Sequence, residues 1–146
     1  MPSLIDAHWH SIFAALPISA LVSADVGYIF LATSSKAERT LLRGFTTVRD
    51  LGGPSFALKQ AIDDGLVVGH RIYPSGAMIT TTGGRGSPSF VRSAKESWRT
   101  VEPHGGSNIA DSADELRLRL REQLAALTTV ARDHYRKSPN ISNHIS

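Results

Sequence analysis

The sequence contains no cysteine among its 146 residues. Disulfides, thiolate zinc sites and cysteine nucleophiles are therefore excluded. It also lacks any apolar run near the roughly 18 residues that cross a membrane. The most hydrophobic early stretch, residues 16–22, is interrupted by Pro17, and no basic segment precedes it as in a signal peptide. We therefore expect a soluble, cytoplasmic protein with no membrane partner.

Clusters of basic charge are missing as well. The formal net charge is +3, but the lysines and arginines are scattered, several of them beside acidic residues in helical patterns. No basic stripe alternates with aromatic residues, as it does on many nucleic-acid-binding faces. We therefore expect no nucleic-acid partner. The hydrophobic fraction of 41% is sufficient for one domain with a real core.

Two histidines lie two residues apart at the end of an apolar stretch, residues 4–10. Because side chains alternate along a strand, His8 and His10 are expected to point to one side and Trp9 to the other. Two imidazoles side by side at a strand end can bind one divalent metal ion. An accidental pair on a polar surface is the alternative, and the pattern alone leaves both interpretations open.

Strand and helix signals alternate along the chain. Strands are predicted over residues 4–10, 45–50 and 71–76, helices over 25–43, 55–64 and from 112 onward, and loops over 11–23 and 80–110. Asp25 is a predicted N-cap, Gly44 a predicted helix end, and Ser112 with Glu115 forms a capping box. The helix over 55–64 is expected to pack through Phe56 and Ile62, and only weakly through Leu58.

This alternation predicts parallel strands joined by right-handed crossovers. Such sheets bind ligands at the C-terminal ends of their strands. His10, Asp50 and the glycine-rich residues 83–86 all lie at such ends, which favours the metal interpretation of the histidines. Arg49 and Asp50 are expected to anchor the end of the second strand as a structural ion pair.

Four motifs then occur in order between residue 2 and about residue 126. They are Pro2-Ser3-Leu4-Ile5-Asp6-Ala7-His8-Trp9-His10, Gly44-Phe45-Thr46-Thr47-Val48-Arg49-Asp50-Leu51-Gly52-Gly53, Thr80-Thr81-Thr82-Gly83-Gly84-Arg85-Gly86 and Arg121-Glu122-Gln123-Leu124. Together they resemble the metal-dependent amidohydrolase superfamily, in its imidazolonepropionase-like and prolidase-like branch. The first motif resembles that family's Pro-Gly-Leu-Ile-Asp-x-His-x-His signature.

The resemblance implies an α/β fold, namely a partial TIM-like (β/α)8 barrel with about the first three βα units. It implies a divalent metal, typically zinc, with one or two ions in full-length members. His8 and His10 match the metal ligands of the first strand. Asp6 matches a position that orients such ligands, with an exposed strand-end carboxylate as the alternative. In the family a metal-activated water attacks amide C–N bonds, which implies a small amide or dipeptide-like substrate.

The resemblance implies that the glycine-rich loop contacts substrate. Its candidate residues here are Thr82, Gly83, Gly84 and Arg85. Arg85 stands where the family has a histidine. A cation at this position is suited to a substrate carboxylate, and a solvent-facing loop arginine is the alternative. Trp9 stands where the family has a smaller apolar residue, and it is expected to pack beneath the helices.

The chain departs from the family pattern in length. A complete (β/α)8 barrel takes about 200 to 250 residues. The family's later ligands, a lysine, two histidines and an aspartate, have no counterpart here, so the catalytic residues are unknown. Neither His70 nor His104 is expected to be a ligand. We expect residues 1–126 to form the amidohydrolase-related part and 127–146 a divergent, disordered tail, in a chain clipped at both ends.

Two hypotheses follow from the sequence. The first is a hydrolase of C–N bonds that uses a metal-activated water, with this chain an incomplete form of it. The second is a non-catalytic remnant that acts as an interaction module. In that case an unpaired edge of the parallel sheet would mediate self-association.

Overall fold

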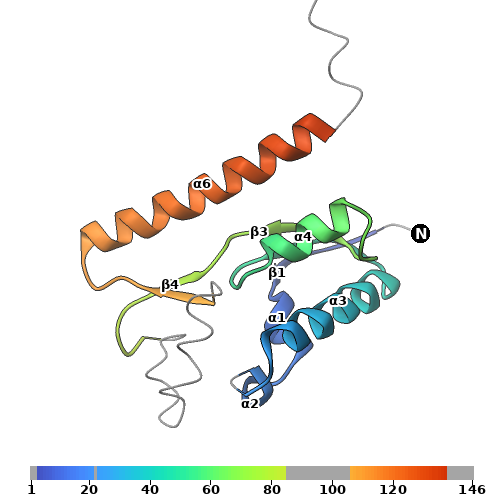
Figure 1. Cartoon of the computed structure of the whole chain (residues 1–146), viewed down its shortest axis with the longest axis horizontal. Helices are drawn as coiled ribbons and strands as arrows, with labels where there is room; N and C mark the ends of the chain where they lie inside the picture. Colours follow the sequence, from blue (N-terminus) through green and yellow to red (C-terminus); the bar gives the residue numbers. More distant parts are fainter. Residues whose placement is uncertain (1–2, 22, 85–105, 138–146) are drawn as a thin grey trace, which may run out of the picture.

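The structure, a computed structural model, describes residues 3–21, 23–84 and 106–137, with side chains described through residue 127. Strands and helices alternate through the first half of the chain (Figure 1). The elements are β1 (Leu4–Trp9), α1 (Ser11–Ala15), α2 (Ile18–Leu21), α3 (Val26–Leu42), β2 (Phe45–Asp50), α4 (Phe56–Asp63), β3 (Arg71–Pro74), β4 (Met78–Thr80), β5 (Ser107–Ile109) and α6 (Ala113–Lys137).

The three strands β1, β2 and β3 form a parallel sheet with β2 in the centre. Strands β2 and β3 pair in continuous register, from Thr47 opposite Arg71 to Asp50 opposite Pro74. The strand β3 ends at its proline, which has no N–H to continue the ladder. The predicted α/β order with parallel strands is confirmed.

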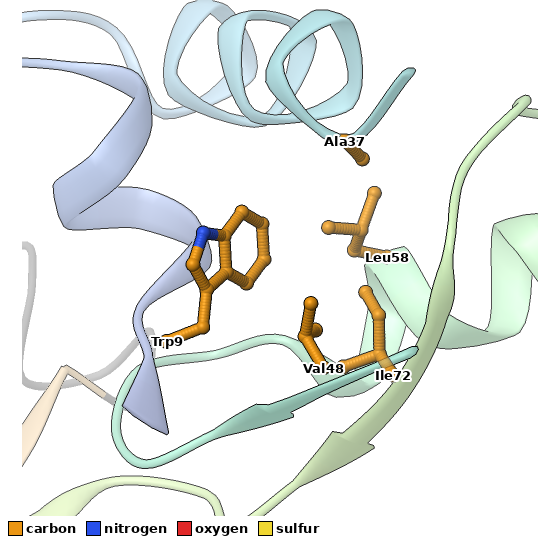
Figure 2. Packing of buried hydrophobic residues seen from close by; sticks show 5 residues of the cluster. All are labelled: Trp9, Ala37, Val48, Leu58 and Ile72. Carbon is orange, nitrogen blue, oxygen red and sulfur yellow. The ribbon is translucent and has the colours of Figure 1, made fainter. Parts of the chain in front are cut away.

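The main hydrophobic core lies between this sheet and the helices α3 and α4. It consists of Trp9, Ala37, Val48, Leu58 and Ile72, which approach one another in Figure 2. Ala37 and Val48 are fully buried. Burying each larger apolar side chain contributes about 1.5 to 3 kcal/mol. Trp9 packs beneath the helices, as predicted.

The helix α3 begins and ends at the predicted residues. The side chain of Asp25 accepts hydrogen bonds from the backbone amides of Gly27, at 2.8 Å, and Tyr28, at 3.4 Å. Gly44 follows the helix with φ +95°, and its amide donates to the carbonyl of Leu41 at 2.9 Å. Glycine adopts this left-handed conformation without a steric penalty, so the chain can turn directly into β2.

Two short helices replace the loop predicted over residues 11–23. Helix α1 begins directly after His10, and together with α2 it supplies a second apolar cluster. This cluster is made by Ile12, Leu21 and Ile29, the last from α3. Helices of four or five residues are too short to show a helical period in the sequence, which is why the prediction failed here.

The packing of α4 also differs from the prediction. Leu58 is the core residue of this helix, with 4% of its surface exposed, whereas Phe56 and Ile62 are half-buried. An eight-residue helix makes only about two turns, so a small rotation decides which apolar position faces the sheet. The tertiary arrangement selected Leu58.

A second, smaller sheet follows. The strands β4 and β5 pair in parallel, from Met78 opposite Ser107 to Thr80 opposite Ile109. Strand β5 lies within the segment predicted as an irregular loop, and β4 lies between the strand predicted to residue 76 and the first residue of that loop. Ser107 and Asn108 have low strand propensity, so no sequence signal marked β5.

The helix α6 begins at the predicted capping box and then crosses the predicted domain boundary at residue 126. It continues to Lys137, and residues 138–146 lie outside the described residues. Its spaced leucines remain exposed, by 42% at Leu116, 44% at Leu120 and 61% at Leu124. Figure 1 shows the helix running apart from the α1–α3 layer. Among the described helices, none has the length and apolarity to cross a lipid bilayer.

Candidate functional site

The side chains of His8 and His10 meet on the side of β1 opposite Trp9. Their ring centroids are 5.3 Å apart with the planes at 74°. Trp9, between them, is buried in the core. The local alternation predicted for these three residues is therefore present, and the two imidazoles form a pair at the C-terminal end of β1.

A β-bulge in β1 lies between Asp6 and Trp9 and includes His8. Asp6 lies opposite Val48 and Trp9 opposite Asp50, so β1 uses three steps where β2 uses two. The carboxylate of Asp6 accepts a hydrogen bond from the backbone amide of His8 at 3.0 Å. Asp6 therefore acts on His8 through the main chain rather than through its ring. Bulges of this kind redirect side chains near strand ends.

The ring of His10 sits in a tighter environment than that of His8. It contacts Phe13 of α1 edge-on, with centroids 5.8 Å apart, and its Nδ1 atom is buried with no hydrogen-bond partner among the described residues. A Cβ added to Gly52 would overlap the Cγ of Met78 and lie 3.7 Å from that Nδ1 atom. Only glycine leaves room at this position.

Asp50 connects the strand ends around the pair. Its Oδ2 atom accepts hydrogen bonds from the backbone amide of Ser11, at 3.0 Å, and from the Ser11 hydroxyl, and its Oδ1 atom accepts one from the amide of Gly52 at 3.1 Å. Its carbonyl accepts the amide of Ser75 after β3. Asp50 and Ser11 are both fully buried.

The ion pair expected for Arg49 and Asp50 is wrong. Neighbouring residues on a strand point to opposite faces, and here Arg49 is exposed while Asp50 is buried. Among the described residues no salt bridge involves either of them. The carboxylate of Asp50 is satisfied by backbone and hydroxyl donors instead.

The glycine-rich loop follows β4 as a tight turn. The amide of Gly84 donates to the carbonyl of Thr81 at 2.9 Å, and Gly83 has φ +75°. Thr82 binds Asp111 through its backbone amide, at 2.7 Å to Oδ1, and through its hydroxyl, at 2.5 Å to Oδ2. These two hydrogen bonds hold the pKa of Asp111 below its ordinary value. Arg85, the remaining candidate of this loop, lies outside the described residues.

Asp111 was not singled out in the sequence. The available signal was its place directly before the capping box, which the structure confirms. The amide of Glu115 donates to the Ser112 hydroxyl at 3.2 Å, and the Glu115 carboxylate accepts the amides of Asp111 and Ser112 at 2.8 and 3.1 Å. The strands' parallel register then brings Asp111 opposite the loop.

His70 is buried and packs as part of the fold. It is 1% exposed, stacks edge-on against Trp9 with centroids 4.6 Å apart, and its Nδ1 atom lies 3.2 Å from the carbonyl oxygen of Ala37. Burial lowers the pKa of His70, and the hydrogen bond to Ala37 and the charge of Asp50 only partly oppose this. His104 lies outside the described residues.

The His8–His10 pair supplies two suitable ligands for a divalent metal ion. Imidazole nitrogens are common ligands of such ions, and the buried Nδ1 atom of His10 has no hydrogen-bond partner in the part of the chain that the structure describes. A zinc site usually has at least three protein ligands. Within the described part of the chain, no group of three or more His, Asp or Glu side chains could hold an ion.

A cleft of about 400 Å³ lies elsewhere, between α4 and α6. Phe56, Gly76 and Gln123 contribute to its lining, and the side-chain amide of Gln123 donates to the carbonyl of Ala77. None of the candidate site residues that the structure describes lines this cleft. It therefore marks the contact of α6 with the rest of the chain.

The sequence model of the amidohydrolase family matches residues 1–140. This chain belongs to the amidohydrolase family. The match covers the His8–His10 pair, Asp50 and the Thr82 turn. Amidohydrolases generally use divalent metals. The resemblance predicted from the four motifs is thereby confirmed.

Individual relatives and solved structures agree with this family membership. The ochratoxinase of Aspergillus niger is 36% identical over 93 residues, which cover 58% of this chain and 19% of that protein. A crystal structure of a prolidase complexed with N-methylphosphonate-L-proline has a TM-score of 0.71 and 30% identity over 86% of this chain and 31% of its own. A Xaa-Pro dipeptidase with bound methionine has a TM-score of 0.65 and 27% identity, with the same coverage of 86% and 31%.

This chain therefore spans less than a third of the length of these amidohydrolases. The structural neighbours are TIM-barrel proteins, and β1, β2 and β3 with their helices correspond to part of such a barrel. The predicted fold class, a partial TIM-like barrel, is confirmed. The ligand roles of His8 and His10, the role of Asp6 and the boundary at residue 126 stay predictions.

Proposed function

We propose that this chain carries the first part of a metal-dependent amidohydrolase site, which hydrolyses a C–N bond in a small amide or dipeptide-like substrate. The observation that carries the proposal is the His8–His10 pair at the end of β1, with its 5.3 Å ring separation and the buried Nδ1 atom of His10, which no described residue hydrogen-bonds. Family membership supports hydrolysis as the reaction class.

In this proposal His8 and His10 hold the metal, with zinc the expected ion. A divalent metal bound there supplies Lewis-acid chemistry and a water with a pKa near neutrality. The chain's own residues orient the ligands. Asp6 holds the His8 backbone, and Asp50 holds Ser11, the residue directly after His10. Further ligands are required to complete a catalytic site.

The substrate class rests on the relatives. A prolidase and a Xaa-Pro dipeptidase are named for dipeptides that contain proline, and an ochratoxinase is also related. We therefore propose an amide-linked amino acid or dipeptide as substrate. In the proposed site the Thr82–Gly84 turn contacts such a substrate, and a cation at Arg85 is suited to its carboxylate.

Metal analysis tests the ligand pair. The purified chain is dialysed against zinc, and bound metal is measured by mass spectrometry in the wild type, in His8→Ala/His10→Ala and in His144→Ala as a histidine-matched control. We expect the double variant to lose the bound zinc and the control to retain it. Equal zinc in all three proteins would contradict the proposal.

A second function is favoured by the exposed edges of the sheet. Within the described residues, β1 and β3 each pair on one side only, and Ile5 and Tyr73 are 71% and 56% exposed. Unpaired strand edges favour association with another chain. If the chain is such an interaction module, sedimentation velocity shows oligomers that Ile5→Lys reduces. A stable monomer at high concentration would count against it.

A further inference from the structure

The turn at Thr81–Gly84 is held from outside by a single carboxylate. Both oxygens of Asp111 are used, one by the amide of Thr82 at 2.7 Å and the other by its hydroxyl at 2.5 Å. The turn's own hydrogen bond runs from Gly84 to Thr81 and leaves the Thr82 amide unused. Asp111 therefore satisfies an amide inside the turn that the turn's own hydrogen bond leaves unused.

The backbone geometry aligns these partners. The ladder of β4 and β5 continues past the strands, because the amide of Ala110 donates to the carbonyl of Thr80 at 2.8 Å. One more step along each parallel strand places Asp111 opposite Thr82. Gly84 is closely packed as well, since a Cβ there would approach the carbonyl oxygen of Thr81 to 3.0 Å. The turn thus has little freedom while Asp111 holds it.

Asp111 is itself fixed by α6. Its amide and that of Ser112 both donate to the carboxylate of Glu115, while the Ser112 hydroxyl accepts the Glu115 amide. The capping box therefore fixes the backbone position from which the Asp111 side chain extends. A continuous set of hydrogen bonds connects the first turn of α6 to the loop.

Strand β4 leads from the neighbourhood of the histidine pair to the turn. Met78 begins β4, close to Gly52 and thus to His10. An extended segment from Met78 to Thr82 reaches at most about 13 Å. Thr82 thus lies within about 13 Å of Met78, a span that lets the turn contact a substrate held at the histidine pair.

We propose that Asp111 is a positioning residue that sets the conformation of the Thr81–Gly84 turn and thereby the affinity of the site for its substrate. This inference rests on the proposed function for the role of the turn. The positioning itself does not depend on activity. In this proposal Asp111 acts through Thr82.

Amide hydrogen exchange in the full chain tests the positioning. Asp111→Asn keeps the shape of the side chain but replaces one acceptor oxygen with a donor. We expect exchange at the Thr82 and Gly84 amides to rise by about tenfold or more, with no change at Val48 in the main sheet. Asp114→Asn is the matched control, because its carboxylate pairs with Arg117 at 2.6 Å on the same helix.

A second readout separates positioning from general support of the fold. The carboxyl group of Asp111 is titrated by NMR, together with the neighbouring Glu115, in the wild type and in Thr82→Val. Loss of the Thr82 hydroxyl should raise the pKa of Asp111 toward its ordinary value, and Thr82→Ser should preserve the low value. Unchanged exchange in Asp111→Asn, or unchanged titration in Thr82→Val, would overturn the positioning role.

The effect of Asp111 on substrate affinity is measured in the presence of zinc, with alanyl-proline as the probe. In Asp111→Asn we expect KM, or the dissociation constant where turnover is absent, to rise about tenfold with kcat unchanged. Failure of the wild type to bind the dipeptide, with the exchange result as expected, would contradict the substrate role of the turn and leave the Asp111–Thr82 positioning intact. A fall in kcat with constant KM would overturn the affinity role.

Discussion

Asp50 and Ser11, 39 residues apart in sequence, are joined by two hydrogen bonds to one carboxylate oxygen in the buried space between β2 and α1. Ser11 directly follows His10, so this contact fixes the point where β1 leaves the sheet. The other oxygen of Asp50 holds the amide of Gly52 at 3.1 Å. A single carboxylate thereby arranges both chain segments next to the His10 ring.

Replacement of Asp50 should destabilise the fold. Asn at this position turns an acceptor into a donor that faces either the Ser11 or the Gly52 amide, so we expect Asp50→Asn to cost about 2 to 3 kcal/mol. Ser11→Ala, which removes only the hydroxyl, should cost about 1 to 2 kcal/mol. Urea unfolding measures both. The control is Asp63→Asn, since its ion pair with Lys59 is near the surface and should change stability by under about 1 kcal/mol.

Stability should depend on pH through His70. Burial lowers its pKa from the ordinary value of 6.5, so the unfolded chain binds a proton at a higher pH than the folded chain. The free energy of unfolding should therefore fall as the pH drops below about 6.5, by at most about 1.4 kcal/mol per pH unit from this group. The loss ends once the pH passes below the lowered pKa of the folded state.

Urea unfolding between about pH 5 and 7.5 checks the role of His70. In His70→Phe, which preserves an aromatic edge against Trp9, the slope should be reduced. Ile72→Val is the non-titrating control from the same core, and it should lower stability by about 1 kcal/mol at every pH. An unchanged slope in His70→Phe would show that other groups cause the acid sensitivity.

The two adjacent glycines after Asp50 should respond differently to alanine. In Gly52→Ala the new methyl overlaps Met78, so we expect a cost of about 1 to 3 kcal/mol. Gly53 has open space around it but φ +118°, so Gly53→Ala should cost about 1 to 2 kcal/mol through backbone strain. Thermal unfolding with Met78→Ala as a second change separates the causes. Met78→Ala should offset part of the first effect and none of the second.

The core position of Leu58 can be checked against Phe56 on the same helix. Leu58→Ala should cost about 2 to 4 kcal/mol, because Leu58 packs between α3 and the sheet and the cavity cannot fill with water. Phe56 is only half-buried at the rim of the cleft beside α6, so Phe56→Ala should cost less despite the larger truncation. Chemical denaturation of the two variants decides the order, and a larger loss for Phe56→Ala would contradict it.

Much of the site could be predicted because its signals are local. The alternation of His8, Trp9 and His10 depends on strand geometry alone, and the Asp25 cap and the Ser112–Glu115 capping box need only a few consecutive residues. The parallel order of β1, β2 and β3 follows from the alternation of strands and helices. These features are determined by chemistry within one or two turns of chain.

Only the tertiary structure decided the long-range partners. Asp50 takes Ser11 instead of an arginine, His70 is enclosed by Trp9 and Ala37, and Asp111 reaches Thr82 across 29 residues. A carboxylate can accept hydrogen bonds from amides, hydroxyls or cationic side chains, so its residue type does not specify which donor it meets. The sequence by itself determined the strands β1 to β3, the longer helices and the histidine pair. Folding in three dimensions chose the contacts that hold them, because those contacts depend on which strand ends come together.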